Sequence, residues 1–164
     1  MDKTIKVGDH FGLVADVKIV LREKSRVGEG IVHFEAQNLI VNTGKRIVLG
    51  SLYPTSLNDS LSYAKAGDGG ATDDLGLFLK TPTPDLTDLY SPVEIMPIAK
   101  ISQNLSIPSM VMIASLDNTQ GNGHLINEAG FFSGNGDMFN IKVFPGVQKT
   151  FDFSIDFEWT IRVI

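Results

Sequence analysis

The side chains best suited to chemistry in this 164-residue chain are carboxylates, and the first group of them lies in a glycine-rich segment. Asp68, Asp73 and Asp74 fall within or just after the run Gly67-Asp68-Gly69-Gly70. Three carboxylates on one loop could gather a hard cation such as Ca²⁺, but they lack the regular D-x-D-x-D-G spacing of an EF-hand. Asp and Gly are also ordinary residues of turns. A solvated turn is therefore the favoured interpretation, and the sequence leaves ion binding open.

A second group of carboxylates lies in the last segment of the chain. Asp152, Asp156 and Glu158 alternate with apolar residues, which places them on one face of an extended strand. A pair of carboxylates is what a glycoside hydrolase needs to cleave its substrate. The same arrangement also results from plain alternation of polar and apolar residues. We therefore expect these carboxylates to meet solvent or another subunit rather than to act as an acid and a base.

The other candidate motifs for catalysis are weak. The three histidines, His10, His33 and His124, are scattered and lack the short spacing of a metal site. Ser62 and Lys65 match the S-x-x-K pattern of penicillin-recognising enzymes, but the companion S-D-N and K-T-G motifs are missing. The chain has no cysteine, which removes thiolate zinc sites and cysteine nucleophiles. We predict a non-enzymatic protein without catalytic, cofactor-binding or metal-binding residues and without a cofactor.

Charge and hydropathy narrow the class of partner. Fourteen basic against nineteen acidic residues give a net charge of −5, which opposes binding to nucleic acid. No apolar run approaches the roughly 20 residues of a membrane span, and the opening residues lack the apolar core of a signal peptide. Residues 101–139 carry only three charged side chains, as expected either of a surface that meets another protein or of buried strands with neutral loops. The expected partners are proteins, not nucleic acid or a membrane.

The last fourteen residues dominate the expected architecture. Seven apolar residues from Phe151 to Val163 alternate with polar ones, which is typical of a half-buried β-strand. At ~3.3 Å per residue this strand would be about 46 Å long, against ~17–20 Å for a common strand. We therefore expect it to bend between two sheets or to be used partly outside its own domain.

Shorter alternating or apolar segments predict seven further strands. They span residues 11–22, 31–37, 63–66, 93–102, 105–116, 124–132 and 138–144. Pro97 and Pro108 each remove a donor from the strand ladder, so their strands are expected at sheet edges or with bulges.

One helix is expected after these first strands, capped by Asn42 or Thr43 and stopped by Tyr53-Pro54. Many short strands with one helix favour a single all-β domain over residues 1–164. We predict an antiparallel, jelly-roll-like β-sandwich with one short helix and an exposed Pro-rich loop or arm at about residues 80–92.

Several blocks of the chain occur in an order that is informative. They are residues 38–44 (NLIVNTG), 63–69 (YAKAGDG), 127–132 (NEAGFF), 138–150 and 157–161 (FEWTI). Taken in this order they resemble a family of small structural or tail-associated virion proteins of tailed bacteriophages, and the closing F-P-x-x-x-K and E-W-T-I are the most telling. Asn140 departs from the arginine that family members often carry, residues 81–92 look like a lengthened loop, and the first 37 residues match nothing in the family.

The resemblance implies a non-enzymatic structural component of a bacteriophage virion, associated with the tail, the neck or a fibre attachment. Such a protein is located in the virion and assembles through contacts with other virion proteins and with copies of itself as a homo-oligomer. A capsid decoration protein is an alternative, as is a receptor- or glycan-binding β-sandwich module with Tyr53, Tyr63 and Tyr90 at its site. In the structural role, Glu128 is expected to be a buried anchor that accepts hydrogen bonds rather than an acid catalyst.

Overall fold

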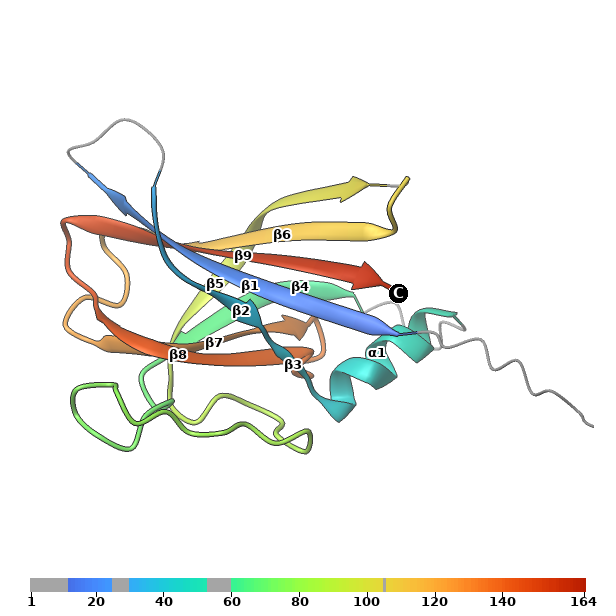
Figure 1. The fold of residues 1–164 in the computed structure, drawn as a ribbon, viewed down its shortest axis with the longest axis horizontal. Coiled ribbons are helices and arrows are strands. Elements are labelled where there is room, and N and C mark those ends of the chain that lie inside the picture. The colour runs from blue at the N-terminus through green and yellow to red at the C-terminus, as the bar shows by residue number, and fades with distance from the viewer. Residues whose placement is uncertain (1–11, 25–29, 53–59, 105) are drawn as a thin grey trace, which may run out of the picture.

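The computed structural model describes residues 12–24, 30–52, 60–104 and 106–164, and it confirms the predicted all-β class with one short helix (Figure 1). The elements in these residues are β1 (Leu13–Glu23), β2 (Ile31–Gln37), β3 (Leu39–Ile40), α1 (Asn42–Leu52), β4 (Leu61–Gly67), β5 (Pro92–Asn104), β6 (Ser109–Leu116), β7 (Leu125–Ser133), β8 (Asn140–Gln148) and β9 (Phe153–Val163). The predictions that concern His10, Phe11, Tyr53, Pro54 and Leu105 fall outside the described residues.

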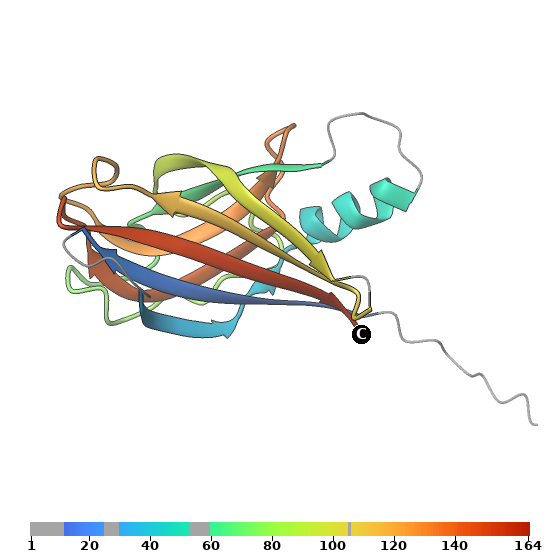
Figure 2. The same cartoon turned by 90° about the horizontal axis from the view of Figure 1, so that it is seen from above.

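The strands form one antiparallel sheet in the order β2-β1-β9-β6-β5-β4-β7-β8-β3. This sheet curls until its two ends approach each other, which gives a nearly closed, sandwich-like body (Figures 1 and 2). The chain between β2 and β3 joins the two ends of the sheet. The backbone amide of Asn38 donates to the carbonyl of Ala15 in β1 (3.0 Å), whereas the next residue, Leu39, pairs with Ile141 of β8.

Side chains hold the seam where β2 passes β8. Nε2 of His33 lies 3.2 Å from the carbonyl oxygen of Pro145. Lys142 donates from Nζ to the carbonyl of Gln37 (2.8 Å), and its ammonium lies 5.4 Å from the ring centroid of Phe34. His33 and Lys142 therefore have a structural use in closing the sheet.

The predicted terminal strand is the centre of the sheet. β9 pairs with β1 from Phe153 to Val163 and with β6 over most of the same length. Its inward side chains include the fully buried Phe157 and Trp159, and the ring of Trp159 meets that of Phe131 edge-on at 4.5 Å. Burying each such side chain contributes roughly 1.5–3 kcal/mol. Because both edges of β9 are occupied by strands of its own sheet, the expected use of this strand by another domain is wrong for this segment.

The structure moves two predicted strand starts, at Phe151 and before Pro108, and shows where Pro97 lies in the sheet. β9 begins at Phe153, because the chain turns at Phe151 and Asp152, and the side chain of Phe151 is 67% exposed. Of the two alternatives predicted for Pro97, a sheet edge or a bulge, the structure favours the bulge: β5 runs between β4 and β6, and its register with β6 shifts between Ile98 and Lys100. Pro108 lies in the turn that precedes β6.

The long connection from β4 to β5, residues 68–91, lies along the outer face of the sheet at β7 and β8 (Figure 1). Leu86, Leu89 and Tyr90 of this connection pack in a second, smaller apolar cluster with Phe132 and Met138. Leu89 is only 5% exposed. Of the two alternatives predicted for the Pro-rich segment, a loop or an arm, the structure shows a loop that packs on the sheet through Leu89.

Helix α1 begins at the end of β3, where the Lys45 amide donates to the carbonyl of Val41 (3.1 Å). The side chains expected to cap it have other partners: Asn42 Nδ2 donates to Asp85 (2.8 Å), and the Thr43 hydroxyl donates to the carbonyl of Met138. These bonds tie the first turn of α1 to the Pro-rich loop and to the sheet.

Candidate functional site

The carboxylates of the terminal strand belong to a row of ion pairs on the outer face of β1 and β9. Arg22 pairs with Asp156, and Lys18 pairs with Glu158 at 3.5 Å; Arg162 and Asp16 form a third pair further along. Opposite charges that face each other across two strands stabilise their pairing modestly.

The individual carboxylates of this strand are engaged with these and other neighbours. Asp156 accepts a further hydrogen bond from the Ser115 hydroxyl (2.7 Å). Asp152 lies outside the row, in the turn before β9, where it accepts from the Thr150 hydroxyl (3.3 Å). The candidate acid and base of a hydrolase therefore form hydrogen bonds and ion pairs with basic and hydroxyl groups of the same chain.

The loop carboxylates have separate structural partners. Asp73 accepts backbone hydrogen bonds from Leu75 (3.2 Å), Leu77 (3.0 Å) and Phe78 (2.6 Å), and the bond from Phe78 is the main cause that lowers the pKa of this carboxyl. Asp73 therefore organises the turn that follows it, as the turn interpretation predicts.

Asp68 forms a pair with His124. Its Oδ2 lies 2.8 Å from Nδ1 of that ring. Burial raises the pKa of Asp68, but the hydrogen bonds from His124 and Ser91 outweigh burial, and the net pKa is lowered. Both residues line a shallow cavity of about 320 Å³ together with Asp73 and Asp74. Among the described residues, no three His, Asp or Glu side chains are placed to hold one metal ion.

Glu128 is the buried anchor that the sequence predicts. Its carboxylate is fully buried and accepts hydrogen bonds from the backbone amides of Gly69 (3.2 Å), Ser91 (2.7 Å) and Tyr90 (3.0 Å). These bonds hold both ends of the connection between β4 and β5 against β7. Burial raises the pKa of Glu128, and the three amide hydrogen bonds only partly oppose that rise. Asn127 adds to this anchor by accepting the amide of Gly70 (2.7 Å).

Lys149 is a second buried charged residue, and sequence reasoning did not single it out. Its ammonium donates to the carbonyl of Thr150 (2.7 Å) and to Oδ1 of Asn122 (3.1 Å), and burial lowers its pKa. These bonds connect the turn before β7 to the turn before β9. Lys149 is the lysine of the F-P-x-x-x-K block, but its hydrogen-bond partners lie outside that block, so the sequence did not indicate that it is buried.

The S-x-x-K pair does not form a catalytic arrangement. Ser62 and Lys65 are three residues apart in β4, so their side chains leave opposite faces of the strand. Ser62 donates to the carbonyl of Ser60 (3.1 Å), while Lys65 pairs with Asp88 (2.8 Å) and lies over the ring of Phe132. Both side chains stabilise local structure.

The tyrosines of the glycan-binding alternative lie in the outer apolar cluster. Tyr63 stacks on Phe132 with ring centroids 5.5 Å apart, and Lys80 lies over the ring of Tyr90 at 4.6 Å. One face of each ring is thus occupied within the chain, which leaves less aromatic surface for stacking on a sugar. Tyr53 is outside the described residues.

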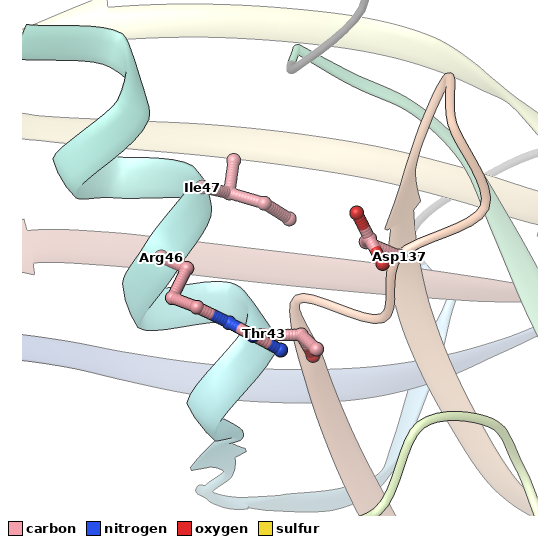
Figure 3. Close-up of a pocket in the computed structure, with 4 residues that line it drawn as sticks. All are labelled: Thr43, Arg46, Ile47 and Asp137. Atoms are coloured by element: carbon pink, nitrogen blue, oxygen red, sulfur yellow. The ribbon is translucent and has the colours of Figure 1, made fainter. Parts of the chain in front are cut away.

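A polar cleft separates α1 from the connection between β7 and β8 (Figure 3). Arg46 and Ile47 of the helix lie on one side of this cavity of about 280 Å³, and Asp137 lies on the other. Gly44 permits this close approach, because a Cβ atom there would lie 2.0 Å from the carbonyl oxygen of Phe139. Opposite charges across an open cleft can bind a small polar group.

A second cavity beside α1 is apolar. We call it the helix pocket; it has a volume of about 280 Å³ and is lined by Leu13, Ile40, Lys45, Val48 and Leu49. Leu49 is 66% exposed at its edge. Lys45 is exposed and places a positive charge beside the apolar lining.

Exposed apolar side chains also gather in the segment that Asp73 organises. We call residues 74–79 the tip. Leu75 is 72% exposed, Leu77 66% and Phe78 71%, and Leu79 is 39% exposed. Single exposed apolar residues are ordinary on protein surfaces, but several neighbouring ones mark a contact surface.

Comparison with known proteins adds no assignment. Neither a protein-family model, nor a curated protein, nor a solved structure matches the chain. No helix in the described parts of the chain is both long and apolar enough to cross a membrane.

Proposed function

We propose that the chain is a non-enzymatic structural component of a bacteriophage virion, associated with the tail, the neck or a fibre attachment, which assembles through contacts with other virion proteins and with copies of itself. The observation that carries this proposal is the tip, a preorganised turn that presents large apolar side chains to solvent. Water-exposed apolar groups of this kind are stabilised when a protein partner covers them.

Two further features support a role in assembly. The blocks from residue 38 to the end resemble small virion proteins of tailed phages. The carboxylates that a hydrolase would need are instead engaged in bonds that hold the fold: Asp156 and Glu158 pair with basic residues, and Glu128 binds three backbone amides. A charged side chain with such partners contributes to the shape of the protein rather than to turnover.

The test is incorporation into particles. The gene would be tagged in its native genome, particles would be purified on a density gradient, and the chain would be quantified by mass spectrometry against the major capsid protein. We expect it to sediment with the particles at several copies per particle, and deletion of the gene to yield particles that lack an intact tail or neck by electron microscopy. A chain that stays in the soluble fraction, or particles that are intact without it, would overturn the proposal.

A further inference from the structure

The tip is held in one conformation before any partner binds. Beyond the three amides that Asp73 accepts, the Thr72 amide donates to the carbonyl of Phe78 (2.9 Å), and Gly146 of β8 donates to the carbonyl of Gly76 (3.3 Å). Gly76 has φ +69°, a conformation that favours glycine, and a Cβ atom there would lie 3.0 Å from Gly146. A surface that is already ordered loses little conformational entropy on binding.

The tip and the helix pocket lie at opposite ends of the long axis of the molecule. The tip is bonded to the end of β8, near the turn that leads to β9, at the left of Figure 1. The helix pocket lies at the other end, where β1 begins beside α1 (Figures 1 and 2). The two surfaces therefore cannot meet within one chain, but they can meet between two copies.

The charges around the two surfaces are opposite in sign. Residues 68–79 carry Asp68, Asp73 and Asp74, and the basic residue that follows them, Lys80, places its ammonium over the ring of Tyr90. The only charged residues of α1 are Lys45 and Arg46, both exposed. Asp74 stands directly before the apolar side chains of the tip, and Lys45 lines the helix pocket. An acidic apolar projection thus matches a basic apolar cavity, which guides association and fixes its register.

We infer that copies of this chain associate head to tail, with the tip of one copy in the helix pocket of the next and Asp74 facing Lys45. This inference rests on the proposed function, since it names the contact through which the protein self-assembles. A contact between two different surfaces of the same chain propagates, and it ends in a ring if the rotation closes and in a filament if it does not.

The contact area sets the strength that should be observed. Phe78 and its apolar neighbours would bury roughly a few hundred Å², because a large aromatic residue alone buries about 150–250 Å². A standard stable interface buries about 800 Å² per partner. A single tip-to-pocket contact is therefore weak in solution and becomes persistent only when ring closure or a neighbouring virion protein adds to it.

Sedimentation velocity over about 1 μM to about 1 mM chain, the range in which weak contacts dissociate, tests the inference. The wild-type chain should show a weight-average mass that rises with concentration. Phe78→Ser in the tip and Leu49→Ser in the pocket should each weaken association by about tenfold or more, because each removes apolar surface from the contact. Ile95→Ser is the matched control: Ile95 is 62% exposed on β5, outside the tip and the helix pocket, so association should not change.

Mixing the two weakened variants gives the decisive result. The Phe78→Ser chain retains an intact pocket and the Leu49→Ser chain retains an intact tip, so one wild-type contact can form between them. The mixture should therefore stop at a dimer of one copy of each. Asp74→Lys and Lys45→Asp should each weaken association, and the chain that carries both changes should recover it. Circular dichroism melting curves would show that each variant is folded.

Three results would overturn the contact. They are a wild-type chain that remains monomeric throughout the range, a mixture that does not dimerise, and an Ile95→Ser chain that loses association as much as Phe78→Ser does. A chain that is found in purified particles but is monomeric in this experiment would leave the proposed function standing and remove only this contact.

Discussion

Replacement of the buried Glu128 by Gln should destabilise the fold, and the structure sets the size of the effect. Oε1 accepts the amides of Gly69 and Ser91, and Oε2 accepts the amide of Tyr90. If the amide oxygen of Gln takes the place of Oε1, its NH₂ group faces the Tyr90 amide, donor against donor. The opposite orientation loses two bonds instead of one. One buried N–H without an acceptor costs about 1–3 kcal/mol, which is the expected loss of unfolding free energy.

The pH dependence of this loss has a definite sign. Burial raises the pKa of Glu128 in the folded protein above its ordinary value of 4.5. A raised carboxyl pKa contributes stability that is fully present below the unfolded-state value and is lost as pH rises through the folded-state value. Gln does not titrate. The wild-type advantage over Glu128→Gln should therefore be largest at a pH below 4.5 and should shrink towards neutral pH.

Urea unfolding measures this difference directly. The chain has one tryptophan, and because Trp159 is fully buried in the core, its fluorescence reports global unfolding. Glu158→Gln is the matched control, since it makes the same chemical change in a partly exposed pair with Lys18, where a loss of only about 0–1 kcal/mol is expected. Amide hydrogen exchange of Tyr90 should also accelerate in Glu128→Gln, because this amide then faces the NH₂ group of Gln and loses its buried acceptor.

Two outcomes would refute the reasoning about Glu128. The first is a Glu128→Gln chain that loses no more stability than Glu158→Gln, which would mean that the three amides are satisfied in another way. The second is a cost that grows as pH rises, which would mean that the hydrogen bonds outweigh burial and that the carboxylate is the favoured form in the folded protein.

Two further substitutions test other parts of the fold. Gly44→Ala should lower the free energy of unfolding in urea by roughly 1–3 kcal/mol, because the added Cβ would lie 2.0 Å from the Phe139 carbonyl oxygen. The cost of this overlap exceeds the ~1 kcal/mol by which Ala usually stabilises a helix relative to Gly. A more stable variant would show that α1 can move away from the sheet at little cost. Asp68→Asn should be less stable than wild type at neutral pH, because a lowered folded-state carboxyl pKa contributes stability above the unfolded-state value of about 3.8. This difference in stability should vanish as pH falls through the folded-state pKa of Asp68. Thermal melts at several pH values measure it, and a difference that persists in acid would contradict the prediction.

The sequence predicts the elements whose apolar residues repeat regularly, and it fails where contacts come from far along the chain. β9 was predictable because its alternation is nearly unbroken, yet the same alternation extended the strand to Phe151, which the structure places in a turn. The packing of residues 68–91 was missed, because Leu86 and Leu89 follow no strand or helix period. Burial of Glu128 was expected from the structural role that the resemblance implies, whereas its amide partners, 37 to 59 residues away, were not foreseen.

The position of the candidate contact follows from how the rest of the surface is used. The outer face of β1 and β9 carries paired charges, and residues 68–91 cover the outer face of β7 and β8. Ile95 and Ile101 on β5 and Ile31 and Val32 on β2 are exposed as well, but each strand carries only two such side chains, as most protein surfaces do. The ends of the curled sheet are different, since the tip gathers four apolar residues at one end and the helix pocket opens at the other. Because the largest group of exposed apolar residues and the apolar pocket lie at opposite ends of the long axis, we expect head-to-tail rather than side-by-side association.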